Sequence, residues 1–159
     1  MNYKIASPKG RYKDKNTFQD TVGYITRDNA CDPNHIITRN IKDVSSIAEE
    51  MAETTNRSGK NHGTRVRHTI ISFGDRDHAT VEKAKKVAES ACDYYGGDYQ
   101  VVAAIHQNTE HLHIHMIMNT TDIHTGKKYQ GKKKDYFAFE NHIRKTAKRH
   151  GMRFEGRIK

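Results

Sequence analysis

The sequence predicts an α+β domain, with a central antiparallel sheet and helices packed on one face of that sheet. Strand-like segments occur at 65–74, 101–105 and 114–118, where apolar residues alternate with polar ones or form short runs. Amphipathic helical patterns lie between and after these segments. A short polar stretch joins the last two strands, so they should form a hairpin. With 159 residues, the chain is expected to be a single domain over 1–159.

The first quarter of the chain is expected to hold a short strand at 2–6 and a helix that begins at about residue 17. Tyr24 lies near the end of this helix, where its hydroxyl could reach a neighbouring surface; a partly buried aromatic fits the spacing as well. Residues 30–41 are interpreted as a loop with a short strand at 35–38. The apolar positions of the helix recur at spacings of four and three: Phe18, Val22 and Ile25.

The middle of the chain should contain a helix, a strand and a long helix. An amphipathic helix at 43–55 begins at a good N-cap residue. In the strand at 65–74, His68 and Ser72 have the same parity and therefore share a face. The clearest helix is at 77–95, and two glycines end it.

The C-terminal part is expected to hold a basic loop near 125–134, a last helix at 137–149 and a tail near 151–159. The loop is expected to be mobile, and the tail either adds a short strand or is mobile too. A run of lysines is usually a solvated surface, and we give a role in contacting phosphate groups nearly equal weight. The candidate phosphate contacts are Lys127, Lys128, Lys132, Lys133 and Lys134.

The hairpin carries four histidines within ten residues. Successive side chains of a strand point to opposite faces, so His113 and His115 share one face. If His106, at the end of the preceding strand, lies on that face too, three neutral imidazoles converge and can bind a metal ion. His111 has the same parity but is assigned to the loop surface. The alternative is a solvated sheet face that happens to be rich in histidine.

The chain is strongly basic, with 28 Lys and Arg residues against 19 Asp and Glu, a net charge of +9 and a pI near 9.5. Such a surplus indicates a polyanionic partner, most often nucleic acid; a basic surface with no specific partner is the alternative. Eight tyrosines and five phenylalanines offer surfaces on which unpaired bases can stack. Two distant cysteines, no signal-peptide pattern and no membrane-length apolar run predict a reduced, cytoplasmic protein.

Three motifs resemble those of conjugative relaxases, the HUH endonucleases that nick plasmid DNA at a transfer origin. HQNTEHLHIHMIMN at 106–119 resembles their third motif, GYITR around Tyr24 their first, and HTIISF around Ser72 their second. The motifs occur in the family's order, and the likeness is greatest to the P-type mobilisation class. The resemblance implies the HUH-endonuclease fold and a DNA-nicking activity.

The resemblance also implies roles for individual residues. Tyr24 would attack a scissile phosphodiester in single-stranded DNA, forming a 5′-phosphotyrosyl link and releasing a 3′-hydroxyl. His106, His113 and His115 would hold a divalent metal ion, Mg²⁺ or Mn²⁺, against the phosphate. In some members of the class the first histidine acts on the tyrosine proton instead.

The implied partner is transfer-origin DNA, with a single-stranded nick region beside a hairpin. Ser72 and Arg27 would contact this DNA. Accessory proteins of the relaxosome and the coupling protein of a secretion system are further partners that the resemblance implies. Insertion into a membrane is not expected.

Asn108 departs from the family pattern, which commonly has an aspartate two residues after the first histidine. A carboxylate there would orient a histidine and raise its basicity. Asparagine cannot balance an imidazolium charge, so the departure favours a metal-ligand role for His106 over a base role. Glu110 or His68 could orient the ligating histidines instead.

The implied chemistry agrees with the sequence. A phenol with an ordinary pKa of about 10 is a poor nucleophile at neutral pH, and a metal ion that stabilises charge on the phosphate lowers the barrier. A phosphotyrosyl link retains the energy of the broken ester, so the 3′-hydroxyl can reverse the reaction without ATP. Consistently, the sequence contains no GxxxxGK[ST] phosphate-binding loop.

Three alternative functions remain at this stage. An HUH replication initiator or transposase would use a tyrosine after the histidine motif, and Tyr129 and Tyr136 are available there. A non-catalytic module for single-stranded nucleic acid would bind DNA without cutting it. A zinc hydrolase would hold zinc tightly and form no DNA adduct.

Overall fold

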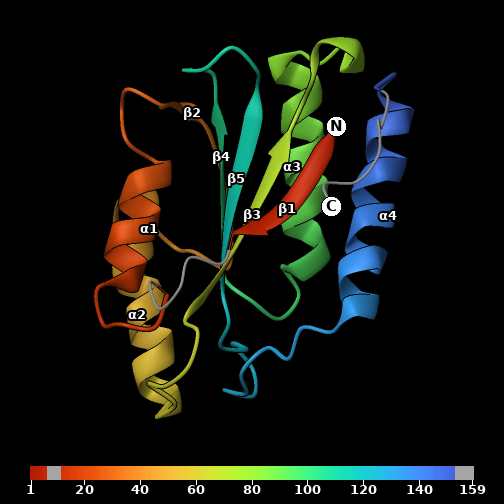
Figure 1. Cartoon of the computed structure of the whole chain (residues 1–159). Helices are drawn as coiled ribbons and strands as arrows, with labels where there is room; N and C mark the ends of the chain where they lie inside the picture. Colours follow the sequence, from red (N-terminus) through yellow and green to blue (C-terminus); the bar gives the residue numbers. More distant parts are fainter. Residues whose placement is uncertain (7–11, 153–159) are drawn as a thin grey trace.

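The computed structural model describes residues 1–6 and 12–152, and its centre is an antiparallel sheet with the strand order β1-β3-β5-β4-β2. The hairpin of β4 and β5 therefore lies inside the sheet, between β3 and β2 (Figure 1). The expected α+β class with a central antiparallel sheet is confirmed. The strands are β1 (Asn2–Ala6), β2 (Cys31–Arg39), β3 (Val66–Ser72), β4 (Val101–His106) and β5 (His113–Asn119).

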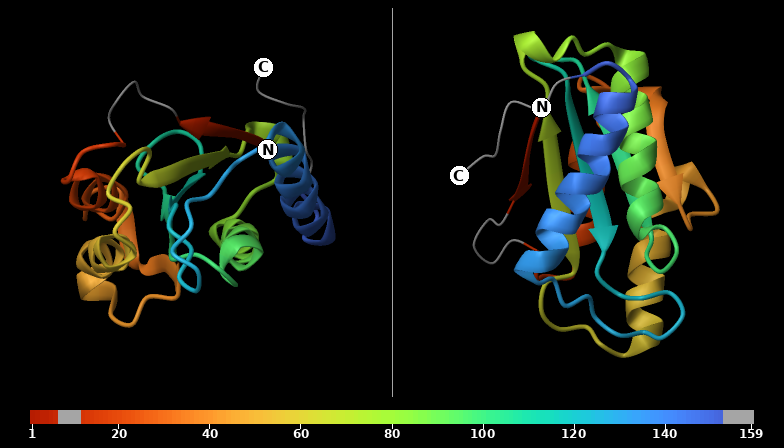
Figure 2. Two further views of the ribbon diagram at one scale, coloured as in Figure 1. Left: turned by 90° about the horizontal axis from the view of Figure 1, so that it is seen from below. Right: turned by 90° about the vertical axis from the view of Figure 1, so that its right-hand side faces the viewer.

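Helices cover both faces of the sheet, whereas the sequence was interpreted as placing them on one. In Figure 2, seen from below, the strands lie between one helix pair, α1 and α2, and a second pair, α3 and α4. Each pair packs on its own buried apolar cluster. The bounds are α1 (Thr17–Ile25), α2 (Ile47–Ser58), α3 (Val81–Tyr95) and α4 (Lys133–Arg149).

The reason for the second helix layer lies in β4. Its first five residues, VVAAI, are all apolar, and every residue of the strand is buried. A strand that is apolar on both faces needs cover on both. Val102 and Ala104 pack with α1 and α2, whereas Val101, Ala103 and Ile105 pack with α3 and α4.

Two further segments differ from the sequence-based assignment. Residues 31–39, expected to be mostly loop, form the whole of β2. This strand is at the outer edge of the sheet, where polar residues and Pro33 are tolerated, and its register shifts between Cys31 and Ile36. The last helix begins at Lys133 rather than at residue 137. The proposed tail at 151–159 lies mostly outside the described residues.

The side chain of Asn119, the last residue of β5, forms hydrogen bonds with α2 and with residues near the end of β5. Its side-chain amide donates to the Met51 carbonyl at 3.1 Å and to Gln100 at 3.0 Å, while its oxygen accepts from the Thr55 hydroxyl and the Thr121 N–H. This fully satisfied buried amide fixes α2 against the end of β5. Among the described residues, no helix combines the length and the hydrophobicity needed to cross a bilayer.

Candidate active site

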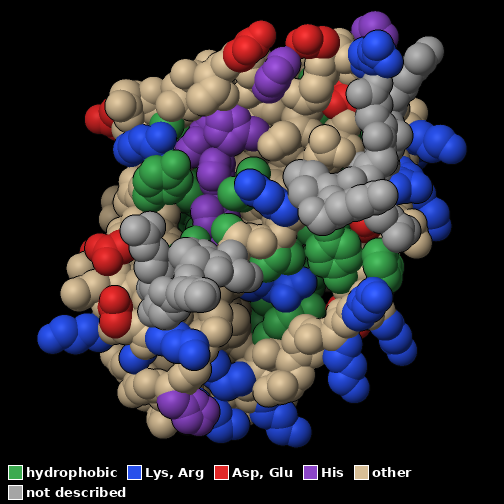
Figure 3. Space-filling view, viewed as in Figure 1, with side chains coloured by type: hydrophobic (Ala, Val, Ile, Leu, Met, Phe, Trp, Pro, Cys, Tyr) green, Lys and Arg blue, Asp and Glu red, His purple; other side chains and the backbone are tan. Residues whose placement is uncertain are grey.

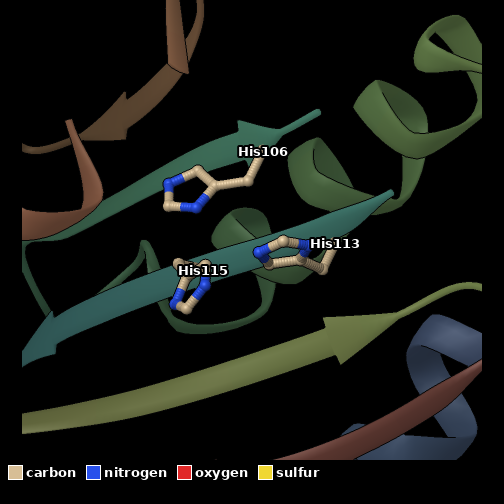
Figure 4. A group of neighbouring side chains, drawn as sticks. All are labelled: His106, His113 and His115. Carbon is tan, nitrogen blue, oxygen red and sulfur yellow. The ribbon is translucent and has the colours of Figure 1, made fainter. Parts of the chain in front are cut away.

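Three histidines meet at one end of the β4–β5 hairpin. His106 is opposite His113 in the antiparallel register, and His115 is opposite Ala104, so the three side chains project from the same face. One ring nitrogen from each histidine lies within 4.8 Å of the others. Figure 4 shows His106 coming from β4 and the other two from β5. We call His106, His113 and His115 the histidine triad.

His106 and His115 are buried, and burial favours the neutral form of their imidazoles. Burial, followed by the neighbouring histidines His106, His68 and His113 and the charge of Arg27, lowers the pKa of His115 to about 2. Burial also lowers the pKa of His106, with His113 and Arg27 adding to the effect. A neutral imidazole keeps a nitrogen lone pair, which is the form that binds a metal ion.

Backbone carbonyls define the free nitrogen on two of the three rings. His106 Nε2 is 2.7 Å from the Ile25 carbonyl, and His113 Nδ1 is 3.1 Å from the His111 carbonyl. A carbonyl oxygen only accepts, so each of these ring nitrogens carries the proton. The lone pairs left for a ligand are therefore on His106 Nδ1 and His113 Nε2.

The third ring is held by a chain of hydrogen bonds that leads away from the triad. His115 Nδ1 is 2.7 Å from His68 Nε2, and His68 Nδ1 is 2.7 Å from the Tyr12 hydroxyl. Two proton arrangements satisfy this chain. Only the one in which His115 donates to His68, and His68 donates to Tyr12, leaves His115 Nε2 with a lone pair. Burial of His68, reinforced by His106 and Lys4, lowers its pKa to about 4.

Tyr24 lies beside the triad at the end of α1. Its ring contacts the His115 ring edge-on, with 5.9 Å between centroids, and half of the side chain is exposed. The Arg27 guanidinium lies 4.1 Å from the centre of the Tyr24 ring and donates to the Tyr24 carbonyl. The next residue of α1, Ile25, accepts from His106, so one helix end positions both the tyrosine and a histidine.

The remaining predicted residues near the triad divide into two groups. Ser72 is opposite His113 in the register of β3 and β5, and His68 is on the same face. Asn108 and Glu110 are exposed in the β4–β5 loop, and within the described chain no hydrogen bond joins either to the triad. Of the two orienting groups that the sequence offers, His68 bonds to His115, whereas Glu110 makes no hydrogen bond to the triad in the described chain. The Ile25 carbonyl bonds to His106.

The five candidate lysines lie at the other end of the sheet. β5 runs from His113 to Asn119, and the segment that carries the lysines follows its far end (Figure 1). Lys128 is half-buried there, and its backbone bridges to Thr121. The other four are exposed: Lys127, Lys132, Lys133 and Lys134. Proximity to the histidines in sequence was therefore a poor guide to proximity in space.

Sequence reasoning missed several groups that contact the triad or its partners. The hydroxyl of Thr109 lies 3.3 Å from His113 Nδ1, and Tyr12 anchors His68. Lys4 is on the histidine face because Ala6, two residues on, pairs with His68. The alternation of side chains along β1 places Lys4 and Ala6 on one face. The pairing of β1 with β3 was needed to identify that face as the histidine face.

The donor set fits a divalent metal ion. It offers three neutral nitrogen donors from three strand positions, each held by a hydrogen bond on its other nitrogen, and none of the three is a carboxylate. Figure 3 shows histidine side chains gathered in one surface patch, with hydrophobic and basic side chains beside it. His106 and His115 are buried and His113 is partly exposed, so a ligand would reach the triad from the side of His113.

Comparison with known proteins agrees with this site. A family model described as "Relaxase: MobA/VirD2-like, nuclease domain" matches residues 24–152, which begin at Tyr24 and include the whole triad. The chain belongs to this relaxase family. The resemblance inferred from the three motifs is thereby confirmed.

Individual relatives of the relaxase domain are distant. This chain is 35% identical over 74 residues to the group II intron-interrupted relaxase LtrB of Lactococcus lactis. The match covers 46% of this chain and 13% of LtrB. The chain is 26% identical over 110 residues to the protein Rlx of Staphylococcus aureus, covering 69% of this chain and 35% of Rlx. The chain thus spans only about an eighth to a third of these two relatives.

A solved structure shares the fold of the relaxase domain. It comes from work on the molecular basis of vancomycin resistance transfer in Staphylococcus aureus, and it matches with a TM-score of 0.52 at 17% identity. The match covers 81% of this chain and 75% of the other. At this identity the likeness concerns the fold, and it confirms the expected relaxase architecture.

Proposed function

We propose that this relaxase domain cuts and rejoins one strand of transfer-origin DNA, with Tyr24 as the nucleophile. The observation that carries the proposal is the contact between the Tyr24 ring and His115 of the triad. Among the described residues, no other tyrosine has a ring contact with the triad. A nucleophile beside three convergent ligand nitrogens is the arrangement that transfer to a phosphodiester requires.

The reaction that we propose is a transesterification. The Tyr24 oxygen forms a bond to phosphorus, its proton passes to water, and the bond from phosphorus to the 3′-oxygen breaks. The released 3′-oxygen takes up a proton, and the 5′ end stays attached to Tyr24. The reverse attack by a 3′-hydroxyl restores the strand, so rejoining needs no cofactor beyond those used for cutting.

Arg27 supports this step through its place over the Tyr24 ring, 4.1 Å from the centroid. A guanidinium there stabilises negative charge as the phenol loses its proton. We also keep Arg27 and Ser72 as contacts for the DNA on either side of the scissile phosphate. Ser72 suits this role because it lies across from His113 on the histidine face.

The triad would hold a divalent cation whose chemistry is to polarise the phosphate and stabilise charge in the transition state. Three imidazoles are softer donors than the oxygen ligands that Mg²⁺ prefers. Of the two ions that the family resemblance implies, we therefore favour Mn²⁺. The hydrogen bond from His106 to the Ile25 carbonyl leaves it a single lone pair, which we assign to the cation rather than to the tyrosine proton.

His68 and Tyr12 act as positioning residues for His115 in this proposal. His68→Ala removes the acceptor that keeps the His115 proton on Nδ1, so Mn²⁺ affinity is expected to fall about 10- to 100-fold. Tyr12→Phe, which removes only a hydroxyl, should have a smaller effect in the same direction. Calorimetric titration with Mn²⁺ measures both.

Two controls separate this effect from general damage. His68→Gln keeps an oxygen that can accept from His115 and should recover part of the affinity. His124→Ala removes an exposed histidine far from the triad and should leave Mn²⁺ affinity unchanged. If His68→Ala is folded by thermal unfolding and binds Mn²⁺ as tightly as the wild type, the positioning role is wrong.

The proposed function is tested by incubating the domain with a single-stranded transfer-origin oligonucleotide and Mn²⁺, followed by mass spectrometry of the protein. We expect a tryptic peptide that contains Tyr24 and carries, through its 5′-phosphate, the fragment on the 3′ side of the nick. Binding without cutting would favour a non-catalytic module. Tightly bound zinc without an adduct would favour a hydrolase instead.

The cellular setting is part of the same proposal. We expect the domain to act in the cytoplasm on a nick region beside a DNA hairpin, together with accessory relaxosome proteins and a coupling protein. The relatives named relaxase support this setting, and the absence of a bilayer-crossing helix among the described residues is compatible with it.

A further inference from the structure

A basic pocket lies at the sheet edge where β3 extends beyond its pairing with β1. The last register pair of the two strands is Ala6 with His68, so Val66 and Arg67 lie outside it. The pocket measures about 470 Å³, and Lys13, Arg67 and Lys128 line it together with backbone and aromatic groups. None of the described residues that line it is acidic.

Two of these half-buried cations each have a buried nitrogen without a hydrogen-bond partner among the described residues. The Lys128 ammonium nitrogen and Arg67 Nε are both shielded from solvent, and neither donates to any group of the described chain. Arg67 instead lies 5.2 Å from the Tyr129 ring centroid. A buried charge that lacks a partner is costly, so such a pair is stable in a folded protein chiefly where an external anion completes it.

The surroundings of Lys128 disfavour its positive charge when no anion is present. Burial, followed by the nearby Arg65 guanidinium, lowers the pKa of the ammonium. A phosphate group in the pocket would offset both effects, because it would neutralise the cluster and accept the idle N–H donors. Figure 3 shows Lys and Arg side chains set among hydrophobic ones near the middle of this face.

Hydrogen bonds connect the pocket to the histidine triad. Tyr12 lines the pocket, its hydroxyl bonds to His68, and His68 bonds to His115. The pocket lies toward the other end of β3 from the triad, and Tyr12 and His68 lie between the two, so a DNA strand that passes the triad can continue along β3 to the pocket. The position suits a backbone phosphate of the same strand.

We propose that this pocket binds a backbone phosphodiester of single-stranded DNA through Lys128 and Arg67. This phosphodiester belongs to the same strand as the scissile phosphate but is a different one. The proposal rests on the nicking function for the identity of the ligand. It differs from a diffuse basic surface, because one defined phosphate would sit among buried donors. Lys128 is then set apart from the four exposed lysines of its segment.

The test is a titration of the Tyr24→Phe variant with oligothymidylate in the presence of EDTA. This variant lacks the proposed nucleophile and EDTA removes metal ions, so binding is measured without cleavage. Lys128→Met is expected to weaken binding about tenfold and to reduce the slope of log affinity against log salt by about 0.7. Lys86→Met is the charge-matched control, since Lys86 is exposed on α3 and its ion-pair partner among the described residues is Glu89. Lys86→Met should change both the affinity for oligothymidylate and the salt slope by less than Lys128→Met does.

A second measurement uses inorganic phosphate. Phosphate should raise the thermal midpoint of the wild type and of Lys86→Met but not that of Lys128→Met. Equal losses of DNA affinity in the two lysine variants would mean diffuse attraction and would overturn the proposal. Stabilisation by phosphate without any Lys128 dependence of oligothymidylate binding would identify a site for free phosphate and would also overturn it.

Folding of the variant is not an obstacle. Exchanging an unpaired buried cation for an apolar side chain of similar length should leave the midpoint unchanged or raise it. If Lys128→Met nevertheless fails to fold, amide NMR of the wild type decides. Oligothymidylate should shift the signals of Thr64, Gln130 and Gly131, and unchanged signals there would refute the pocket whatever the outcome of nicking assays.

Discussion

Replacing Tyr24 with phenylalanine is expected to abolish the covalent DNA adduct and to slow strand cleavage by at least about 10³-fold. The substitution removes one oxygen and leaves the ring that contacts His115. Because the side chain is half exposed, the free energy of unfolding should change by no more than about 0.5 kcal/mol. A nicking gel with Mn²⁺ and mass spectrometry of the protein measure the two effects.

Tyr129→Phe and Tyr136→Phe are the matched controls, because an HUH initiator or transposase would use one of them. Tyr136 stacks on Tyr3 with 4.5 Å between centroids, and Tyr129 packs edge-on against Tyr95. Both contacts belong to the cluster beneath α3 and α4, on the opposite face of the sheet from the triad. Both variants should keep the adduct, and loss of the adduct only in one of them would move the nucleophile away from Tyr24.

Much of this site follows from strand parity, which is why the sequence could predict it. A strand alternates its faces, so the spacing of His113 and His115 places them together whatever the rest of the fold does. The tight polar connection then brings His106 back to the same end. The α+β class, the hairpin and the helix that carries Tyr24 follow from equally local patterns.

Other features depend on which segments meet, and local patterns do not encode that. The Tyr12, His68 and His115 chain requires β3 beside β5 and the Tyr12 side chain beside His68. The far position of the lysines depends on the direction of β5. The second helix layer does have a local signal, since VVAAI is apolar at each position and a strand that is apolar on both faces needs cover on both.

Asn108 shows how a chain can depart from its family's pattern at a single position. Without an acid at this position, the sequence favours a ligand role for His106 over a base role and leaves the orienting group to other residues. The structure supplies that function from elsewhere: the Ile25 carbonyl accepts from His106, and the His113 ring is held by the His111 carbonyl. A backbone carbonyl orients an imidazole without adding charge, so it favours a neutral ligand over a general base.

If the three histidines are neutral metal ligands, replacing any one of them should have a large effect on metal binding and on cleavage. His106→Ala, His113→Ala and His115→Ala are each expected to weaken Mn²⁺ binding at least about 100-fold and to remove detectable cleavage, because each loses one of three donors. Electron paramagnetic resonance of Mn²⁺ measures binding separately from activity. His111→Ala is the control within the motif, since its side chain is in the loop near Asp75 and its backbone carbonyl remains.

The His106 variant separates the ligand role from the base role. If His106 only accepted the tyrosine proton, His106→Ala would bind Mn²⁺ like the wild type, and cleavage would recover as rising pH ionises the tyrosine. If it is a ligand, the loss of Mn²⁺ binding matches that of His115→Ala, and raising the pH restores nothing. The single free nitrogen left by the Ile25 carbonyl allows only one of these roles at a time, and the triad geometry favours the second.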